Sequence, residues 1–229
     1  MSAAIRGISS MATRQLLAEL TDLYRQQCDG AVHIESVGGV DAARRVQSGE
    51  PFDVVLLASE AIDKLIAAGA AVAGSKVDLV HSPVAAAVRA GTPSPAVGSE
   101  EALHRAVLAA PSIGYSTGPS GTSLMRLFEH WGIAAEIQPR LKQAPPGVPV
   151  GSMLAAGEVA LGFQQLSELI HVEGITIAGA LPRPVQIITT FSGAVCTTCT
   201  QPDAVRRLLS FLASPEAAAA KRRHGMEPA

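Results

Sequence analysis

The sequence predicts an α/β fold of two Rossmann-like lobes with a ligand cleft between them. Three observations lead to this prediction. Apolar strands alternate with amphipathic helices along the chain, only 3% of the 229 residues are aromatic while 48% are hydrophobic, and two proline-marked stretches interrupt the alternation about 100 residues apart. Strands that alternate with Ala-rich helices are typical of layered α/β domains.

The first lobe begins with three strand-loop-helix units. The three strands are expected at residues 5–8, 32–37 and 52–58. Each precedes a segment whose apolar residues recur at helical spacing. Two further strands are expected at 77–80 and 85–90, and we expect them to be separate because Pro83 cannot donate a hydrogen bond within a regular central strand.

A second series of elements follows, with a helix after Ser99 and a proline-rich loop at 144–149. The other expected elements are a strand at 112–115, a helix at 122–131, a short helix at 150–156, a strand at 159–163, a short helix at 166–170, a strand at 185–190, and C-terminal helices that begin at Pro202 and Pro215. Proline is favoured in the first turn of a helix.

At the two proline-marked stretches, the chain is expected to cross from one lobe to the other. They predict that one lobe is inserted into the other. Lobe 1 is expected to contain residues 1–81 and 185–229, and lobe 2 residues 82–184. Ligands of open α/β sheets bind at the carboxyl ends of the strands. A ligand is therefore expected between the lobes.

Composition argues against several classes of protein. The net charge is −2, and the only basic cluster, Lys221 to His224, is expected to close a helix, so nucleic acid is not expected as a partner. No apolar run is long enough to insert into a membrane. Residues 1–8 are too short for a signal peptide, which leaves a cytoplasmic protein or one whose leader was removed.

Neither a metal nor a cofactor is expected. Cys196 and Cys199 form a C-x-x-C pattern, but they lie in a β-prone run where positions three apart face opposite sides. The glycine-rich stretch 114–121 lacks the lysine that a nucleotide-binding loop requires.

That stretch is the most informative part of the chain, because it joins an apolar strand to an amphipathic helix through glycines and hydroxyls. A helix N-terminus offers unpaired N–H groups and a partial positive charge. Comparable loops carry Ser9 and Ser10, and Gly38 and Gly39. The donors expected in the later loop are Ser116, Thr117, Ser120, Gly121 and Thr122. The chemistry offered is capture of an anion, although such loops also cap ordinary helices.

Taken together, these segments resemble the type 2 periplasmic solute-binding proteins, and within them the molybdate-binding branch. The resemblance is carried by Ile8-Ser9-Ser10-Met11, Gly38-Gly39-Val40, the strand and loop 52–59, the strand 157–163 and the C-terminal run 208–225. It covers essentially the whole chain. It implies the type 2 periplasmic-binding-protein architecture, a periplasmic location and a small anionic ligand delivered to an ABC-transporter permease.

Departures from the molybdate-binding pattern leave the ligand open. Gly39 stands where those proteins usually have a serine, and Gln164 or Gln165 stands in place of a late tyrosine. With Val148 of the proline-rich loop, these residues are expected to contact the ligand. A further resemblance, carried by 8–12, 118–121, 145–149 and 162–169, is to a subgroup that includes aconitate isomerases.

These residues and resemblances leave two functions open, a binder and an isomerase. A binder would need only the anion-capturing loops, with Arg89 or Arg183 as additional carboxylate contacts. An isomerase would need a base to move a proton, and the candidates are His81, Tyr115 and, less well placed, Glu35. A third class, the effector-sensing domain of a transcription regulator, would need a helix-turn-helix for which no segment remains.

Overall fold

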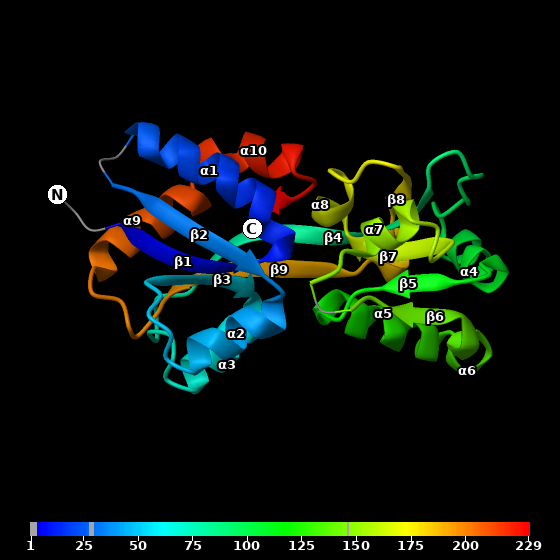
Figure 1. Ribbon diagram of the computed structural model, residues 1–229, viewed down its shortest axis with the longest axis horizontal. Helices are drawn as coiled ribbons and strands as arrows, with labels where there is room; N and C mark the ends of the chain where they lie inside the picture. The colour runs from blue at the N-terminus through cyan, green and yellow to red at the C-terminus, as the bar shows by residue number, and fades with distance from the viewer. Residues whose placement is uncertain (1–3, 28–29, 146) are drawn as a thin grey trace. The chain divides into compact units, whose positions relative to one another are not determined.

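The computed structural model describes residues 4–27, 30–145 and 147–229. The chain separates into two compact units (Figure 1). Unit 1 contains the chain up to His81 and from Thr190 onward, and unit 2 contains Ser82–Thr189. The sequence prediction also divided the chain after His81, and it placed the second crossing after Pro184. Cys28 and Pro146 lie outside the described residues.

Unit 1 is built around parallel strands. Its first elements are β1 (Ile5–Ser10), the 3-10 turn η1 (Met11–Thr13), α1 (Arg14–Gln27), β2 (Val32–Val37), α2 (Gly39–Gln47), β3 (Val54–Ala58) and α3 (Ser59–Ala67). Two long strands, β4 (Val77–Arg89) and β9 (Ile188–Val195), belong partly to each unit. The C-terminal elements are α9 (Pro202–Ala213), the 3-10 turn η4 (Pro215–Ala217), α10 (Ala218–Arg223) and β10 (Glu227–Pro228).

Helices cover both faces of this sheet. β1 pairs in parallel with β2 and with β3, and β9 pairs antiparallel to β3. Val54 and Leu56 pack in a core with α1 and α9, whereas Val55 and Leu57 pack with α2 and α3. Figure 1 shows α1 and α9 on one side of β1–β3 and α2 and α3 on the other. All five residues of β3 are buried, as a strand covered on both faces requires.

Unit 2 repeats the plan with shorter strands. Its elements are α4 (Glu100–Ala109), β5 (Ile113–Tyr115), α5 (Pro119–His130), α6 (Ala134–Ile137), the 3-10 turn η2 (Gln138–Arg140), β6 (Leu141–Gln143), α7 (Val150–Ala155), β7 (Leu161–Gln165), α8 (Leu166–Leu169), β8 (Ile175–Ala180) and the 3-10 turn η3 (Arg183–Val185). The sequence prediction missed β6, which has only three residues, and β8.

The sheet of unit 2 also has two covered faces. β5 lies between β6 and β7 and is parallel to both, while β4 is antiparallel to β7. The core on one face contains residues of α4, α5 and α6, and the core on the other contains residues of α7. Gly162 lets α7 approach the sheet, because a Cβ there would lie 2.7 Å from side-chain atoms of Val150 and Leu154. The predicted α/β fold class is confirmed, and the ligand cleft between lobes stays a prediction.

The expected break in β4 at Pro83 is wrong, because the strand runs without interruption from Val77 to Arg89. Its partners change at the proline. β10 pairs with Val80 and His81, whereas β7 begins to pair at Val84. Pro83 therefore falls where its missing N–H interrupts neither of these ladders.

The expected extended geometry of Cys196 and Cys199 is also wrong. β9 runs over Ile188–Val195, not 185–190, and the chain turns immediately after it. The Cys199 N–H donates to the Cys196 carbonyl oxygen at 3.1 Å, so the two cysteines close a tight turn. Burial raises the pKa of the Cys196 thiol to about 12. The thiol therefore stays protonated at neutral pH and has a structural role in the core.

Helix α5 begins at Pro119, three residues before the expected start, and Gly121 is the reason that its first turn can close. A Cβ on Gly121 would lie 1.9 Å from the carbonyl oxygen of Ser116. A side chain at this position would force the loop away from the helix.

We therefore expect Gly121→Ala to destabilise the protein by about 3 kcal/mol through overpacking, which lowers Tm by roughly 6 to 12 °C for a chain of this size. The matched control is Gly98→Ala, because Gly98 is exposed and a Cβ there meets nothing within 4 Å. Thermal unfolding followed by circular dichroism measures both. Equal Tm values for the two variants would contradict the close approach at Gly121.

Candidate anion-binding site

The carboxyl ends of β1 and β2 bring two serines together. Ser9 is fully buried, and its Oγ lies 2.7 Å from the Oγ of Ser36. The parallel register pairs Ser9 with Ser36. The sequence prediction included Ser9 but missed Ser36, although both hydroxyls stand one residue before the end of a strand.

Ser10 and the start of α2 lie next to this pair. Ser10 Oγ accepts a hydrogen bond from the Ala12 N–H at 3.3 Å. A Cβ built on Gly39 would lie 3.8 Å from Ser10 Oγ, so the backbone at Gly39 is beside that hydroxyl. Gly38 precedes α2 and Ala58 precedes α3, and within the described chain neither helix start has a side-chain cap. Because β2 and β3 flank β1, their uncapped helix N-termini flank Ser10.

Unit 2 presents a second set of donors where β5 ends. Ser116 Oγ lies 3.0 Å from Ser120 Oγ, and Gly118 precedes α5 with no side-chain cap among the described residues. Thr117 and Thr122 are exposed, and the Thr122 N–H is already bonded to the Gly118 carbonyl oxygen. The loop thus joins Ser116 to Ser120 and leaves the two threonine hydroxyls at the surface.

The two glutamines lie at the end of the neighbouring strand. β7 is parallel to β5 with Tyr115 opposite Phe163, and Ser116 and Gln164 are the next residues of the two segments. The side-chain Oε1 of Gln164 accepts from the Gly151 N–H at 3.4 Å. Gln165 Nε2 donates to Thr189 Oγ1 at 2.7 Å. Val148 is 41% exposed and lies in the loop before α7, where its N–H bonds to the Pro145 carbonyl oxygen.

Sequence reasoning missed Glu168, the titratable residue nearest to these glutamines along the chain. It lies in α8, immediately after β7, and is partly buried. Burial raises the pKa of its carboxyl group to about 7, against the effect of a hydrogen bond from Gln164 that favours the charged form. The available signal was a lone charge within the apolar run Leu166–Ile170.

The three residues proposed as bases have different surroundings. His81 is partly exposed, and its Nδ1 lies 3.0 Å from Thr190 Oγ1. Tyr115 packs against the core of unit 2. Glu35 accepts two hydrogen bonds from Arg45, at 2.7 and 3.0 Å, and these bonds hold its pKa below the usual value. A carboxylate so stabilised is a weak base.

The two arginines proposed as carboxylate contacts, Arg89 and Arg183, are exposed. A Cβ built on Gly157 would lie 3.2 Å from an Nη of Arg89. Arg89 therefore lies against that turn.

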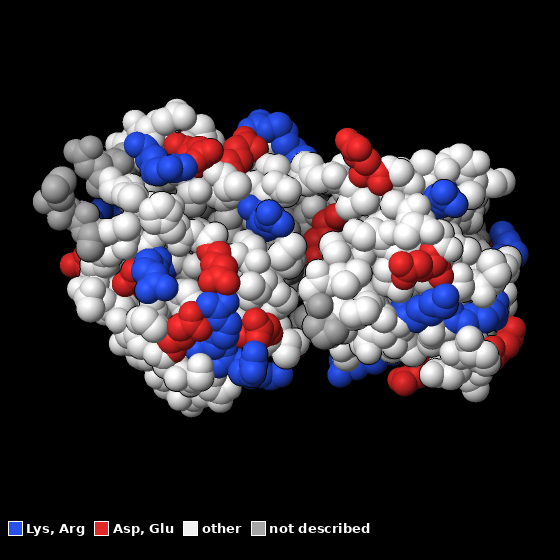
Figure 2. All heavy atoms as spheres, in the orientation of Figure 1, with Lys and Arg blue, Asp and Glu red and all other residues white. Residues whose placement is uncertain are grey.

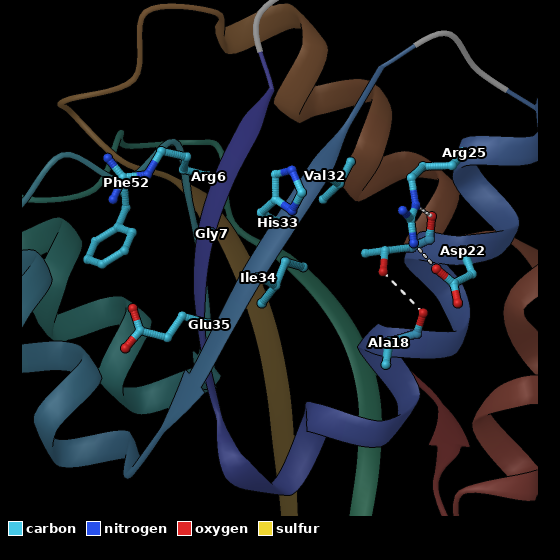
Figure 3. A pocket seen from close by; sticks show the side chains of 11 residues that line it. Arg6, Gly7, Ala18, Asp22, Arg25, Val32, His33, Ile34, Glu35 and Phe52 are labelled. Carbon is cyan, nitrogen blue, oxygen red and sulfur yellow. Dashed lines mark hydrogen bonds and ion pairs between the residues drawn. The ribbon is translucent and has the colours of Figure 1, made fainter.

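A surface hollow of about 480 Å³ lies along β2, away from these strand ends. Figure 3 shows Arg6, Phe52 and Glu35 on one side of β2, with Asp22 and Arg25 of α1 on the other. Arg25 pairs with Asp22, and the Arg6 guanidinium lies 5.9 Å from the centre of the Phe52 ring. Of the hollow's charged groups, Arg25 and Asp22 pair with each other, and Glu35 is bonded to Arg45 outside the lining. The lining includes none of the predicted ligand residues.

In the face that Figure 2 shows, basic and acidic side chains lie next to one another and form no single basic patch. Among the described residues, no group of three His, Cys, Asp or Glu side chains could hold a metal ion. In the same residues, no helix is long and apolar enough to cross a membrane.

The chain belongs to the bacterial extracellular solute-binding protein family, whose model matches residues 5–227. A relative is the aconitate isomerase of Pseudomonas sp, which is 41% identical over 185 residues, or 80% of this chain and 70% of that protein. The resemblance read from the sequence is therefore confirmed at the level of the family.

Solved structures agree on the fold. The periplasmic molybdate-binding protein of Azotobacter vinelandii superposes with a TM-score of 0.80 at 20% identity, covering 97% of this chain and 98% of that one. The sulfate-binding protein SubI of Mycobacterium tuberculosis gives a TM-score of 0.78 at 17% identity, covering 99% and 87%. The shared architecture is that of the periplasmic binding proteins.

The raised pKa of Glu168 has a measurable consequence for stability. The folded form holds this proton up to about pH 7, whereas the unfolded form loses it near the ordinary value of 4.5. Stability from this group is therefore lost as pH rises between these values and is constant above them. We expect Glu168→Gln, which stays neutral, to gain in Tm relative to the parent from pH 5 to pH 7.5.

Differential scanning fluorimetry between pH 4.5 and 8.5 measures the difference in Tm. Glu158→Gln, on an exposed glutamate of the same unit, is the matched control. A Glu168→Gln difference that is flat with pH would contradict the burial of this carboxyl group.

Proposed function

We propose that this protein captures a small anion, an oxyanion or a di- or tricarboxylate, as the binding component of an ABC-type transport system. The observation that carries the proposal is the cluster at the end of β1. There Ser9, Ser10 and Ser36 lie beside the uncapped N-termini of α2 and α3, each nine residues long. Unpaired N–H groups and the helix dipoles favour negative charge at such a place.

The proposed ligand contacts are neutral. They are Ser9, Ser10, Gly38, Gly39, Ser116, Thr117, Ser120, Gly121, Thr122, Val148, Gln164 and Gln165. Hydroxyls and amides donate hydrogen bonds without introducing a full opposite charge. A ligand held in this way keeps its own charge and can be released again, as delivery requires.

The family supports a periplasmic location, and with it a membrane permease as the partner that receives the ligand. The described residues contain no helix able to cross a membrane.

A second candidate function is the cofactor-independent isomerisation of an unsaturated tricarboxylate. The observation that favours it is the 41% identity to the Pseudomonas aconitate isomerase over 80% of this chain. A tricarboxylate meets the same requirement for anion-binding donors, and the reaction adds the need for a group that moves a proton. His81 and Tyr115 are the catalytic residues that the sequence suggests.

Ser10→Ala is expected to weaken binding of the preferred anion by about 10- to 100-fold, since a hydrogen bond to a charged group contributes roughly 1.5–3 kcal/mol. Ser48→Ala, on an exposed serine of the same unit, is the matched control. Isothermal titration calorimetry measures both after a thermal-shift screen of molybdate, sulfate, citrate and the two aconitate isomers. Unchanged affinity in the Ser10 variant would count against the site.

The same ligands separate the two candidate functions. An absorbance assay that follows interconversion of the aconitate isomers is run on the parent protein. Binding of an anion without interconversion supports the solute-binding role, and interconversion supports the isomerase.

A further inference from the structure

We propose that the outer edge of β2 is an interface between two copies of this chain, in which the two β2 strands pair antiparallel about a twofold axis and join their sheets. The proposal concerns a surface of unit 1 and is independent of which candidate function is correct. It is carried by the shape of the surface beside β2 and by charges on β2 and α1 that complement those of a second copy.

β2 is the first strand in the order of its sheet and has β1 as its neighbour. The Ile5 N–H donates to the Ala31 carbonyl oxygen at 2.8 Å, so the backbone groups of Ala31 turn toward β1. Successive residues of a strand direct these groups to opposite sides, and Val32, Ile34 and Ser36 therefore present their N–H and C=O groups at the outer edge. Such an edge can pair with a further strand.

Two surface hollows lie along this edge. The first, of about 480 Å³, is lined by residues 32–35 of β2, by α1 on one face and by Arg6 and Phe52 on the other (Figure 3). The second, of about 380 Å³, continues along α1 toward the carboxyl end of β2, and both hollows include Ala18 and Ile34 in their lining. The space is open on both faces of β2, as the position of an additional strand must be.

The charges on β2 favour a second copy as the occupant and select one register. His33 and Glu35 are exposed on the same face of the strand. A twofold axis at Ile34 brings His33 of each copy opposite Glu35 of the other, in a non-hydrogen-bonded pair with Cα atoms about 4.5 Å apart. An axis at His33 or at Glu35 would instead place identical side chains opposite each other. The side chain of Glu35 is 51% exposed although it pairs with Arg45, so its carboxylate is accessible to a second partner.

Helix α1 has a complementary pattern about the same axis. Ala18 and Ile34 line both hollows, so an axis at Ile34 passes close to Ala18. Arg14 and Asp22 stand one helical turn before and one helical turn after Ala18, and all three are exposed. The two copies of α1 would run antiparallel, with Arg14 of each next to Asp22 of the other. The small side chain of Ala18 lets the helices approach at the axis.

The first test measures self-association of the full chain by sedimentation velocity up to about 100 μM. We expect the parent to form a species of twice the chain mass. Ala18→Arg should raise the dissociation constant of the dimer at least about 100-fold, because two like charges would meet at the axis. Gln15→Arg is the matched control, since Gln15 is exposed on the same helix and lines neither hollow. It should dimerise as the parent does, and circular dichroism verifies that both variants are folded.

The second test addresses the register. An equimolar mixture of His33→Cys and Glu35→Cys should give a disulfide-linked dimer on oxidation, because the two positions would lie within the distance that a disulfide spans. Neither variant alone should do so above the level of the parent, which has three cysteines of its own. Non-reducing electrophoresis measures the linked species.

Three outcomes would overturn the proposal. The first is a parent that remains a monomer throughout the concentration series, which would leave the edge of β2 to an extended segment of a different protein. The second is an Ala18→Arg variant that dimerises as tightly as the parent. The third is crosslinking of either cysteine variant alone to the same extent as the mixture.

Discussion

Parallel strand pairing is the constraint on which the rest of this structure depends. When β1 pairs in register with β2 and β3, their carboxyl ends meet at one edge of the sheet, and every loop that leaves those ends must turn into a helix on one face or the other. The unpaired N–H groups of the helices are thereby gathered at the same edge. Ser9 and Ser36 come within 2.7 Å for this reason alone, although 27 residues separate them in the chain. The same geometry places Tyr115, the residue before Ser116, opposite Phe163, the residue before Gln164, in unit 2.

Much of this could be predicted from the sequence because the signals are local. The buried strand β3 and the stripe of apolar residues in α1 follow directly from hydrophobic periodicity. The loops of unit 1 and the loop before α5 could be recognised from glycines and hydroxyls at strand ends. These signals fix the class of fold and the type of donor that each loop presents.

What could not be predicted depends on partners that are distant in sequence. Pro83 was taken as a break, but a change of strand partner at that residue lets β4 continue. Ser36 could not be recognised from the sequence, because only its register with Ser9 brings it to the site. Glu168 looks like an ordinary surface charge in a short helix, and only tertiary burial and the Gln164 side chain give it an unusual carboxyl group. The extended geometry expected of Cys196 and Cys199 was wrong because the end of β9 is set by pairing with β3 rather than by β-propensity.

The discontinuous construction of unit 1 sets the order in which the protein can fold during synthesis. Residues 82–189 form a unit of their own and leave the ribosome before residues 191–195, the segment of β9 that pairs with β3. The sheet that holds Ser9 and Ser36 therefore stays incomplete, with one edge of β3 unpaired, until the chain beyond Thr190 has emerged. An exposed strand edge of this kind favours non-native association, so nascent chains that stall before residue 190 are the species most in need of a chaperone.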